Sequence, residues 1–583
     1  MALLPPIPDP ADQEALALLC HEVVKQPPQS LKALRKILRQ YPKPQGGFFS
    51  KAEIIRALRA DFPSEGDEAN FWLQASGLLK KPTRTLSGVT PVTVLTKPHP
   101  CPGKCVFCPN DVRMPKSYLF NEPGSRRAWN NGFDPYRQVL SRLMNFWQHG
   151  HATDKVELII LGGTFTFYPE AYQRYFVGRC FDALNDFSSF DEAALYDHTT
   201  TQTPFTTVSP NDSQRRGKYN SWVNKVFSEN DFGESEWENY DWERLTQAHQ
   251  KNEGSANRCV GLVVETRPEE ITEAQGYFLR RLGCTKIQVG LQSNRDEILK
   301  RNKRGHLTED NKNACELLRR MGFKIHGHVM VNLLGASVES DLEDFKSFFT
   351  DHRLRPDELK IYPCALVEDT ELYGAYEKGD WAPYAPQELE SLLKNILLSV
   401  PLYCRVSRMI RDFSADDIVV GNKKANLRQI IQHQLSDQEQ IPVEIRSREI
   451  RSKSSHEPNA IFSVIQYETG AGEEAFLQFT TNDDKILAYL RLGLPRIEAP
   501  FQEIVDAALV REVHVYGKSL PLHGPTEGGS QHQGYGERLL EEAAKIARAA
   551  GFSKLSVISG VGTRGYYRKK GFADGTLYQH RAL

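Results

Sequence analysis

The residues most clearly suited to chemistry are three cysteines on one short segment. The sequence CPGKCVFC places Cys101, Cys105 and Cys108 at the spacing C-x3-C-x2-C. Three thiolates can ligate three irons of a 4Fe-4S cubane and leave the fourth iron open to an external ligand, whereas a cluster with four cysteines has no vacancy. A zinc site is the alternative, because His99 could supply a fourth ligand. The spacing, with the aromatic Phe107 before the last cysteine, favours the cluster.

The other seven of the ten cysteines are scattered along the chain. We interpret them as buried, inert thiols, and whether Cys364 and Cys404 hold a second metal stays open at this stage. The first residues, MALLPPIPDPADQE, do not read as a secretory signal. A disulfide framework is therefore not expected, and we predict a cytoplasmic protein.

A second constellation is the glycine turn QHQGYG at 531–536, which precedes the amphipathic segment ERLLEEAAKIARAAG. Gly534 and Gly536 free the backbone to approach a ligand, and a helix N-terminus offers amides and a positive dipole end. The turn therefore predicts a pyrophosphate site. The later segment GTRGYYRKKGF carries Tyr566 and Tyr567, each of which could serve that site or pack in the core.

Length, composition and charge limit the number of domains and the classes of partner that we expect around these motifs. A chain of 583 residues exceeds the size at which one hydrophobic core keeps growing, so two or more domains are expected. No stretch approaches the roughly 18 apolar residues of a membrane span. The net charge of -1 gives no overall attraction to nucleic acid, but 31–59 and 405–451 are strongly basic and 228–247 is acidic.

From about 85 to 365, short apolar strands alternate with helical stretches. The strands are VELIILGG, VGLVVET, KIQVGLQS, KIHGHVMVNLLG and LKIYPC. This order predicts a parallel sheet with βα units, either a barrel or a doubly wound sheet, and periodicity does not choose between them. The polar stretch 186–257 interrupts the rhythm, and we interpret it as a structureless insertion without chemistry.

The last part of the chain has a different character. After a basic connector, the strands AIFSVIQYE, EEAFLQFTT, KILAYLRLG and LVREVHVYG lead into the glycine turn, a helix and the strand KLSVIS. Such an order predicts a separate α+β domain that runs to the C-terminus.

The cysteine spacing resembles that of radical S-adenosylmethionine (SAM) enzymes. Glycine-rich residues that end a strand meet the amino group of SAM in that family, and other polar residues that end strands line the same face, where ligands bind in such folds. The resemblance implies a partial (β/α) barrel of the radical SAM type and SAM as a cofactor. The residues expected to bind it are Gly162, Gly163, Thr164, Glu265 and Gln292.

The order of strand, Q-x-x-G-x-G turn, helix and strand resembles the Gcn5-related N-acetyltransferases, in which the turn binds the pyrophosphate of CoA. Both halves in this order resemble one protein type, the Elongator catalytic subunit and its prokaryotic single-chain relatives. Shared blocks include KPTRTLSGVTPVTVLTKPHPCPGKC, ETRP, LKIYP, REVHVYG and VISGVGTRGYYRKKGF. The short gap between the first two cysteines points to a prokaryotic member.

The resemblance implies a tRNA-modifying acyltransferase that places a carboxymethyl group on carbon 5 of the wobble uridine. Cleavage of SAM at the cluster would yield a radical that takes hydrogen from the methyl group of acetyl-CoA, and the resulting carbon radical would add to the base. The implied partners are the tRNA anticodon stem-loop, acetyl-CoA and an electron donor. No membrane partner is expected, and accessory subunits or a homo-oligomer stay open.

The family's functional residues map onto a defined set in this chain. The predicted catalytic residues are Tyr566, Tyr567 and Glu512. The predicted acetyl-CoA contacts are Lys155, Glu512, Val513, His514, Val515, Gln531, Gly534, Tyr535, Gly536, Glu537 and Tyr567. Lys155 lies in the radical half, so its inclusion implies that CoA bridges both domains, although it could be a plain strand-edge lysine.

Four regions follow from this reading. They are a basic helical tRNA-binding region at 1–84, a radical SAM domain at 85–365, a basic linker at 366–455 and an acetyltransferase-like domain at 456–583. The phosphates of tRNA require a cationic track. We assign to it the 31–59 helices together with Arg405, Arg408, Arg411, Lys423, Lys424, Arg446, Arg448 and Arg451.

Two other functions are compatible with these motifs. One is a protein lysine acetyltransferase with a structural iron-sulfur domain, for which Glu512 would be the base. The other is a non-catalytic tRNA-binding scaffold, against which the intact cysteine motif argues.

Overall fold

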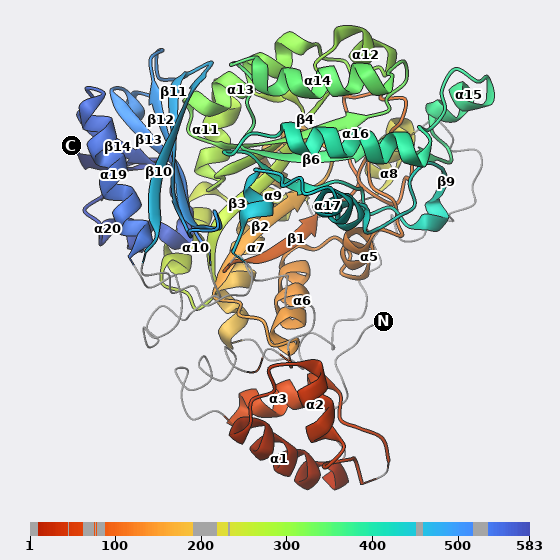
Figure 1. The fold of residues 1–583 in the computed structure, drawn as a ribbon, viewed down its shortest axis with the longest axis vertical. Helices are drawn as coiled ribbons and strands as arrows, with labels where there is room; N and C mark the ends of the chain where they lie inside the picture. Colours follow the sequence, from red (N-terminus) through yellow and green to blue (C-terminus); the bar gives the residue numbers. More distant parts are fainter. Residues whose placement is uncertain are drawn as a thin grey trace.

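In the described part of the chain, two seven-stranded sheets and a small two-stranded sheet are accompanied by a separate group of N-terminal helices (Figure 1). The computed structural model describes residues 10–44, 46–61, 75, 77–78, 88–189, 219–230, 234–450, 459–516 and 534–583. Within these segments, every helix is too short or too polar to cross a membrane.

The first sheet is entirely parallel, and its strands follow one another in chain order. It consists of β1 (Thr90–Leu95), β2 (Lys155–Leu161), β3 (Arg258–Thr266), β4 (Lys286–Gln292), β5 (Lys324–Val331), β6 (Glu358–Pro363) and β8 (Arg405–Arg408). The sheet curls into a partial barrel, so the predicted partial (β/α) barrel is confirmed (Figure 1). Parallel strands of this kind need connecting helices that cover their outer face.

Those helices pack on the apolar side of the sheet. Alternate strand residues such as Val156, Leu158 and Ile160 are fully buried in this core. The covering helices are α6 (Pro135–Gln148), α7 (Glu170–Asp186), α11 (Glu273–Arg281), α13 (Thr308–Arg320), α14 (Val338–Thr350) and α16 (Pro386–Ser399). Shorter elements complete the domain: α5 (Pro123–Asn130), α12 (Asp296–Arg301), α15 (Glu371–Glu377), α17 (Leu427–Asp437), α18 (Ile445–Arg448), β7 (Leu366–Val367) and β9 (Ile418–Val420).

Two segments differ from the sequence-based prediction. The expected linker at 366–455 supplies β8, the last strand of the parallel sheet, so that sheet extends past 365. The expected structureless insertion at 186–257 contains three helices in its described part, namely α8 (Tyr219–Glu229), α9 (Glu234–Asn239) and α10 (Trp242–Glu253). The prediction of a structureless segment is therefore wrong for those residues.

The second sheet belongs to the C-terminal domain. Its strands run in the order β10 (Ile461–Thr469), β11 (Gly472–Thr480), β12 (Ile486–Pro495), β13 (Ala507–Val515), β14 (Lys554–Val557), β16 (Gln579–Ala582) and β15 (Ala573–Asp574). All neighbours are antiparallel except β13 and β14. Helix α19 (Tyr535–Ala549) packs its apolar face on this sheet, while α20 (Arg564–Arg568) lies beside it, which confirms the predicted α+β domain.

The N-terminal helices form a small unit of their own. Helices α1 (Pro10–Lys25), α2 (Leu31–Leu38) and α3 (Lys51–Asp61) enclose a core that includes Leu19, Leu34 and Ile54. The unit meets the barrel through Arg59, which donates to the backbone oxygen of His151 at 3.1 Å and stacks over Trp147.

A buried ionic cluster joins the two sheets. Asp357, directly before β6, accepts hydrogen bonds from Arg511 of β13 at 2.5 and 3.1 Å. Arg491 of β12 and Arg319 of α13 lie within 3.8 Å of the same carboxylate, and Glu474 of β11 pairs with Arg319 and Arg511. Burial would raise the pKa of Asp357, but the arginines hold that pKa well below its usual range. The carboxylate thus stays ionised inside the protein.

Asp357→Asn should destabilise the protein by about 3–5 kcal/mol, because only Glu474 and Glu512 would then balance the three buried arginines. The measurement is the urea midpoint of unfolding. The matched control is Asp351→Asn, whose carboxylate pairs with Lys312 at a partly exposed site and should change stability by less than about 1 kcal/mol. Equal midpoints for the two variants would contradict a decisive role of the cluster.

Candidate active site

The three predicted cluster cysteines lie on the loop that follows β1. Arg304 donates to the sulfur of Cys105 at 3.0 Å, and Arg267 donates to it at 3.6 Å. Burial would raise the pKa of Cys105, but these two guanidinium groups lower it. A thiolate is the form that binds iron, so these guanidinium groups prepare Cys105 for metal, whereas burial raises the pKa of Cys108 to about 11.

The residues present fit an iron-sulfur cluster better than a single zinc ion. Among the described residues, no three His, Cys, Asp or Glu side chains converge on one ion position. A cubane does not require such convergence, because each thiolate binds a different iron. His99, the suggested fourth zinc ligand, stacks on Tyr168 with 4.4 Å between ring centroids. Burial lowers the pKa of His99 to about 4.

The predicted SAM residues come together at the carboxyl ends of β2, β3 and β4. Thr164 lies beside the cluster loop, with its hydroxyl 3.9 Å from the sulfur of Cys101. A Cβ at Gly162 would lie 2.0 Å from the hydroxyl of Thr96, and one at Gly163 would lie 2.6 Å from a backbone oxygen, so neither position has room for a side chain. Their role as SAM contacts stays a prediction.

Glu265 and Gln292 border the same loop. Glu265 accepts a hydrogen bond from the hydroxyl of Tyr118 at 2.5 Å. Gln292 has a φ of 67° and a buried side chain, whose amide nitrogen lies against Gly290. Such a left-handed residue that is not glycine is uncommon and stores local strain, which often marks a ligand site.

The concave face of the barrel carries a column of buried and partly buried polar side chains that the sequence analysis did not single out. Its members stand at every second position of β4, β5 and β6, beside Glu265 of β3: the buried Lys286, Gln288, His326, His328 and Glu358 and the partly buried Lys324 and Lys360. A period of two is the strand repeat, so these residues share one face. The signal in the sequence was the pattern K-I-Q, K-I-H-G-H and E-L-K.

The column links the two domains. At its lower end, Lys324 contacts Glu512 of β13 at 2.6 Å and Glu358 at 3.4 Å. Above this, His326 lies 3.7 Å from Glu358, and its ring packs edge-on against the ring of His328.

The other end of the column lies near the carboxyl ends of the strands. It reaches the side of the barrel that carries the cysteine loop, which we call the cluster face. Lys360 donates to the amide oxygen of Gln288 at 2.5 Å, and His328 lies 2.9 Å from that oxygen. The other ring nitrogen of His328 is 3.8 Å from Glu265, which Tyr118 contacts. Contacts between polar side chains therefore run from the C-terminal domain to Tyr118 in the segment after the cysteines, with the ring contact between His326 and His328 as one link.

Burial sets the protonation of this column. It lowers the pKa values of His326 and His328 well below their usual range, so both rings are neutral. It also lowers the pKa of Lys360 to about 7. For Glu358, burial would raise the pKa, but Lys286 and Lys324 hold it well below its usual value. Lys360 is thus the member of the column whose pKa suits proton exchange near neutral pH.

The predicted acyl-CoA turn lies where the second sheet opens. β13 pairs with β14 only over Ala507–Val510 and continues to Val515. Gly534 caps the N-terminus of α19 with a φ of 73°, a conformation that favours glycine. The first-turn amides of a helix have no partner within the helix, so this end suits an anion. Gln531 lies outside the described residues.

The two predicted tyrosines occupy different environments. The hydroxyl of Tyr566 faces the turn, because a Cβ at Gly536 would lie 2.8 Å from it. Tyr567 is buried in the domain core, where its ring packs on Phe572. Burial raises the pKa of Tyr567. The geometry therefore favours Tyr566 as the tyrosine that reaches a ligand at the turn.

The other predicted acyl-CoA residues also differ in whether their side chains are buried or exposed. The ring of Tyr535 is buried and packs against Phe479, which leaves only its backbone for a ligand. Glu537 is at the surface and pairs with Lys570 at 2.7 Å. The side chains of Val513 and Val515 pack against the domain core.

His514 supplies a polar atom that a ligand could use. Its ring stacks with Tyr489 and also contacts the ring of Tyr516. Its buried Nε2 atom has no hydrogen-bond partner among the described residues. Buried polar atoms are normally paired, so this nitrogen fits a ligand seated at the open edge of β13.

Glu512 is held as an ionised carboxylate. It contacts Lys324 at 2.6 Å, Tyr489 at 2.8 Å and Arg491 at 2.9 Å. Burial would raise the pKa of Glu512, but Lys324 and Arg491 lower it to about 2. Such a carboxylate is a poor base for an amine, so the geometry disfavours the protein lysine acetyltransferase alternative.

Lys155 lies at the border of the two domains. It begins β2 and pairs with Arg258 of β3. Gly562 of the C-terminal domain packs against the side chain of Arg258. Burial lowers the pKa of Lys155. A ligand that bridges the domains could therefore reach this lysine.

Several residues of the predicted cationic track point inward instead. Arg448 is 2% exposed and donates to Gln478, so its prediction as a surface cation is wrong. Arg405 is held between Glu358 and Glu449. Arg446 donates to the backbone of Ser407, as does Arg411 to that of Ser117. Sequence alone does not reveal these partners.

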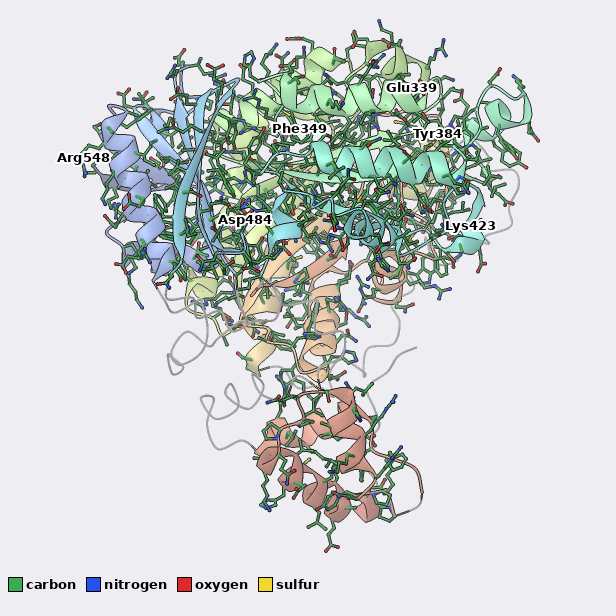
Figure 2. The ribbon with its side chains drawn as sticks, viewed as in Figure 1. Glu339, Phe349, Tyr384, Lys423, Asp484 and Arg548 are labelled. Carbon is green, nitrogen blue, oxygen red and sulfur yellow. The ribbon has the colours of Figure 1, made fainter. Side chains whose placement is uncertain are left out.

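The remaining members are closer to solvent. Arg408 pairs with Asp412, and Lys424 pairs with Glu390. Lys423 is exposed at the surface before α17 (Figure 2). Arg451 lies outside the described residues, and α2 exposes Lys32, Arg35 and Lys36.

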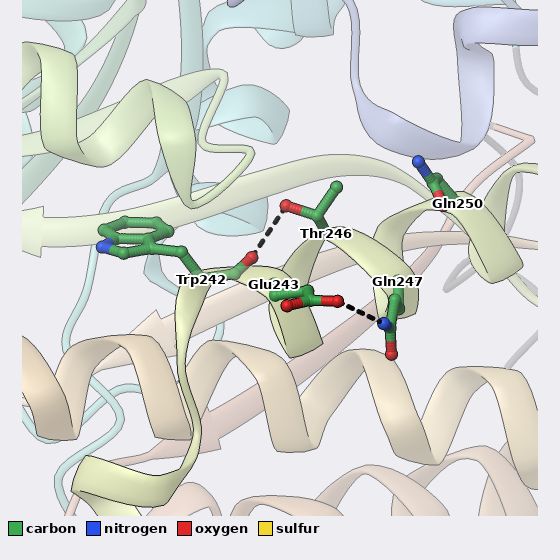
Figure 3. A pocket seen from close by; sticks show the side chains of 5 residues that line it. All are labelled: Trp242, Glu243, Thr246, Gln247 and Gln250. Atoms are coloured by element: carbon green, nitrogen blue, oxygen red, sulfur yellow. Dashed lines mark hydrogen bonds between the residues drawn. The ribbon is translucent and has the colours of Figure 1, made fainter.

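Two further features do not form part of the site. Cys364 and Cys404 are buried in different apolar clusters, so they do not share a second metal. A hollow beside α10 is lined by residues of that helix alone (Figure 3). Its polar groups bond within the helix, and its lining residues are Trp242, Glu243, Thr246, Gln247 and Gln250.

Lys360→Met should remove a pH dependence of stability. The folded pKa is about 7 against 10.5 normally, so the unfolded chain binds more protons between these values and stability rises with pH there. In the variant this rise should shrink by roughly 2–4 kcal/mol. Urea midpoints at pH 7 and pH 10 measure it. The exposed Lys346→Met is the control, and identical pH profiles of both variants would contradict the assignment.

Two family models match the chain. The Radical SAM superfamily matches residues 238–349, and the Radical_SAM C-terminal domain matches residues 356–437. The first match begins after the cysteine loop. The two matches cover most of β3 to α17, which includes the polar column.

Proteins from archaea and animals are similar over most of the length. A tRNA uridine(34) acetyltransferase of Methanocaldococcus infernus is 35% identical over 523 residues, which cover 87% of this chain and 88% of the relative. Elongator complex protein 3 of Bos taurus is 32% identical over 517 residues, which cover 85% of this chain and 84% of that protein. Among solved structures, the archaeal Methanocaldococcus infernus Elp3 with an N-terminal deletion is 32% identical, with a TM-score of 0.66, and the match covers 86% of this chain and 100% of that one.

Proposed function

The chain belongs to the family of tRNA uridine(34) acetyltransferases and Elongator complex protein 3. From this premise we propose that it is a radical SAM enzyme that adds a carboxymethyl group to carbon 5 of the wobble uridine of tRNA, with acetyl-CoA as the carbon source. The single observation that carries the proposal is the polar column between the acyl-CoA domain and the cluster face.

The cysteine loop provides the cofactor end of this arrangement. A 4Fe-4S cluster at Cys101, Cys105 and Cys108, together with SAM, supplies reductive cleavage and hydrogen abstraction. Arg267 and Arg304 balance the negative charge of the ligands. The cluster needs an external electron donor, which we count among the partners.

The acyl-CoA end is built by the C-terminal domain. The N-terminus of α19 binds the pyrophosphate of CoA, and Tyr566 and the Nε2 atom of His514 face the acyl arm. Lys155 extends the site across the domain border. Glu512 acts as a positioning residue, because its contacts with Lys324 and Arg491 align β13 with the barrel.

Side chains of the column handle protons and exclude water between the two ends. Lys360 and His328 share the amide oxygen of Gln288, so both are oriented toward the centre of the barrel. A lysine with a pKa near 7 can stabilise a developing oxyanion or transfer a proton to it. These are the steps that adding a carbon fragment to a uracil and releasing a carboxylate require.

The partners follow from this chemistry. tRNA needs cationic contacts for its phosphates, and α2 exposes three basic residues on the N-terminal unit. Ten free thiols and an iron-sulfur motif fit a reducing compartment, so we place the protein in the cytoplasm.

Anaerobic reconstitution tests the proposed reaction. Protein supplied with iron, sulfide, SAM, a reductant, acetyl-CoA and tRNA should form 5-carboxymethyluridine, detected by nucleoside analysis. Cys105→Ser should abolish the product and the cluster absorbance, because one iron loses its thiolate. Cys364→Ser, a buried cysteine outside the loop, is the matched control and should retain both.

Two results would contradict the proposal. One is a wild-type protein that holds its cluster and cleaves SAM but leaves tRNA unmodified. The other is efficient acetylation of lysine peptides without any effect of tRNA, which would favour the protein acetyltransferase.

Binding of tRNA should depend on α2. Lys32→Ala combined with Lys36→Ala should reduce the slope of log affinity against log salt by about 1.4–1.8, since each of two phosphate contacts contributes roughly 0.7–0.9. Filter binding at several salt concentrations measures the slope. Lys545→Ala with Arg548→Ala, which removes two exposed cations from α19 (Figure 2), should leave it unchanged. An equal slope for both pairs would exclude α2 from the interface.

A further inference from the structure

Helix α8, from the segment that interrupts the barrel, lies against the cysteine loop. The side chain of Asn220 pairs with both backbone groups of one cysteine ligand. Its Oδ1 atom accepts from the amide of Cys101 at 3.0 Å, and its Nδ2 atom donates to the oxygen of Cys101 at 2.8 Å. One side chain thereby holds the peptide groups on either side of the Cys101 Cα.

The same helix packs on the far end of the loop. Tyr219 is buried and donates to the backbone oxygen of Met114 at 2.8 Å. The ammonium of Lys116 lies over its ring at 4.8 Å. Val223 joins Val112 in a small apolar cluster. Helix α8 therefore contacts the loop on both sides of the three cysteines.

Aromatic residues of α8 and α9 enclose the segment that leads into the loop. The ammonium of Lys97 lies 3.6 Å from the ring centroid of Trp237 and 4.8 Å from that of Phe227. Tyr172 of α7 completes the enclosure at 4.9 Å. The ring of His99 packs edge-on against Phe227. Such cation–π contacts fix a buried lysine in one position.

The cysteine loop has two arms, one at Cys101 and one at Cys105, and different segments of the chain hold them. Val106, next to Cys105, donates to the backbone of Asn302 at 3.2 Å and accepts from Leu372 at 2.8 Å, both of which belong to the barrel domain. On the other arm, Asn220 of the interrupting segment holds Cys101.

We propose that α8 and α9 form a clamp that fixes the Cys101 arm of the cluster loop, with Asn220 as its positioning residue. The clamp rests on the proposed function, because it presupposes a cluster at these cysteines. Asn220 itself is exposed, so its two hydrogen bonds compete with water. Their effect is expected in the order of the loop rather than in global stability.

Cluster loss in air tests the clamp. Asn220→Ala should lose the visible absorbance of the reconstituted cluster about three- to ten-fold faster than the wild type, the range expected for one or two hydrogen bonds. The matched control is Asn230→Ala, since Asn230 lies at the end of α8 and bonds only to the backbone of Val226 among the contacts described. Equal rates for the two variants would overturn the proposal.

Hydrogen exchange of the cluster-free protein gives a second readout. Peptides that cover 97–108 should exchange faster in Asn220→Ala than in Asn230→Ala, and unchanged exchange would overturn the clamp. Should Asn220→Ala be insoluble, Asn220→Asp keeps an acceptor for the Cys101 amide but lacks the donor, and the same comparison applies. A wild-type protein that takes up no cluster would refute the proposed function, while the exchange experiment would still decide the clamp.

Discussion

Two adjacent carboxylates at the start of β6 connect the barrel with the C-terminal domain. Asp357 is bonded by arginines of the second sheet, whereas Glu358 is bonded by lysines of the barrel. Both groups are buried, and an unpaired charge there would be very costly. Each carboxylate is therefore tied to cations from other elements. Together they fix where the C-terminal domain sits against the barrel and where the polar column begins.

The consequence is a barrel used at both ends. In a parallel barrel the carboxyl ends of the strands carry the ligand site, and the cysteine loop lies there as expected. The amino ends usually serve stability, but here Lys324, which also contacts Glu358, pairs with Glu512 of the C-terminal domain. Because strand side chains alternate, the same strands continue the polar face upward through Gln288 and His328. The two-residue repeat of the strands therefore connects the junction with the C-terminal domain at one end of the barrel to the cysteine loop at the other end.

Much of the fold was predictable from the sequence, whereas features that depend on contacts between distant segments were not. Apolar strands and the cysteine spacing are local signals, so both sheets and the metal loop could be located. Strand β8 was missed because its arginines look like surface cations until Glu358 and Glu449 are seen beside Arg405. The polar column was missed because the strands were judged by their apolar content, although the period of two was present. Asn220 has no local signal at all, since its partner lies 119 residues away.

The contacts that join the domains also restrict the chemistry. A base that activates an amine must be free to accept a proton, yet Glu512 is bound by Lys324 and Arg491 and its pKa lies at about 2. Removing those cations to free the carboxylate would also separate β13 from the barrel. In the proposed function, an acyl group at the open edge of β13 faces a column of neutral imidazoles and a proton-exchanging lysine that leads to the cysteine loop. The domain junction thus disfavours acyl transfer to an amine and favours chemistry directed into the barrel.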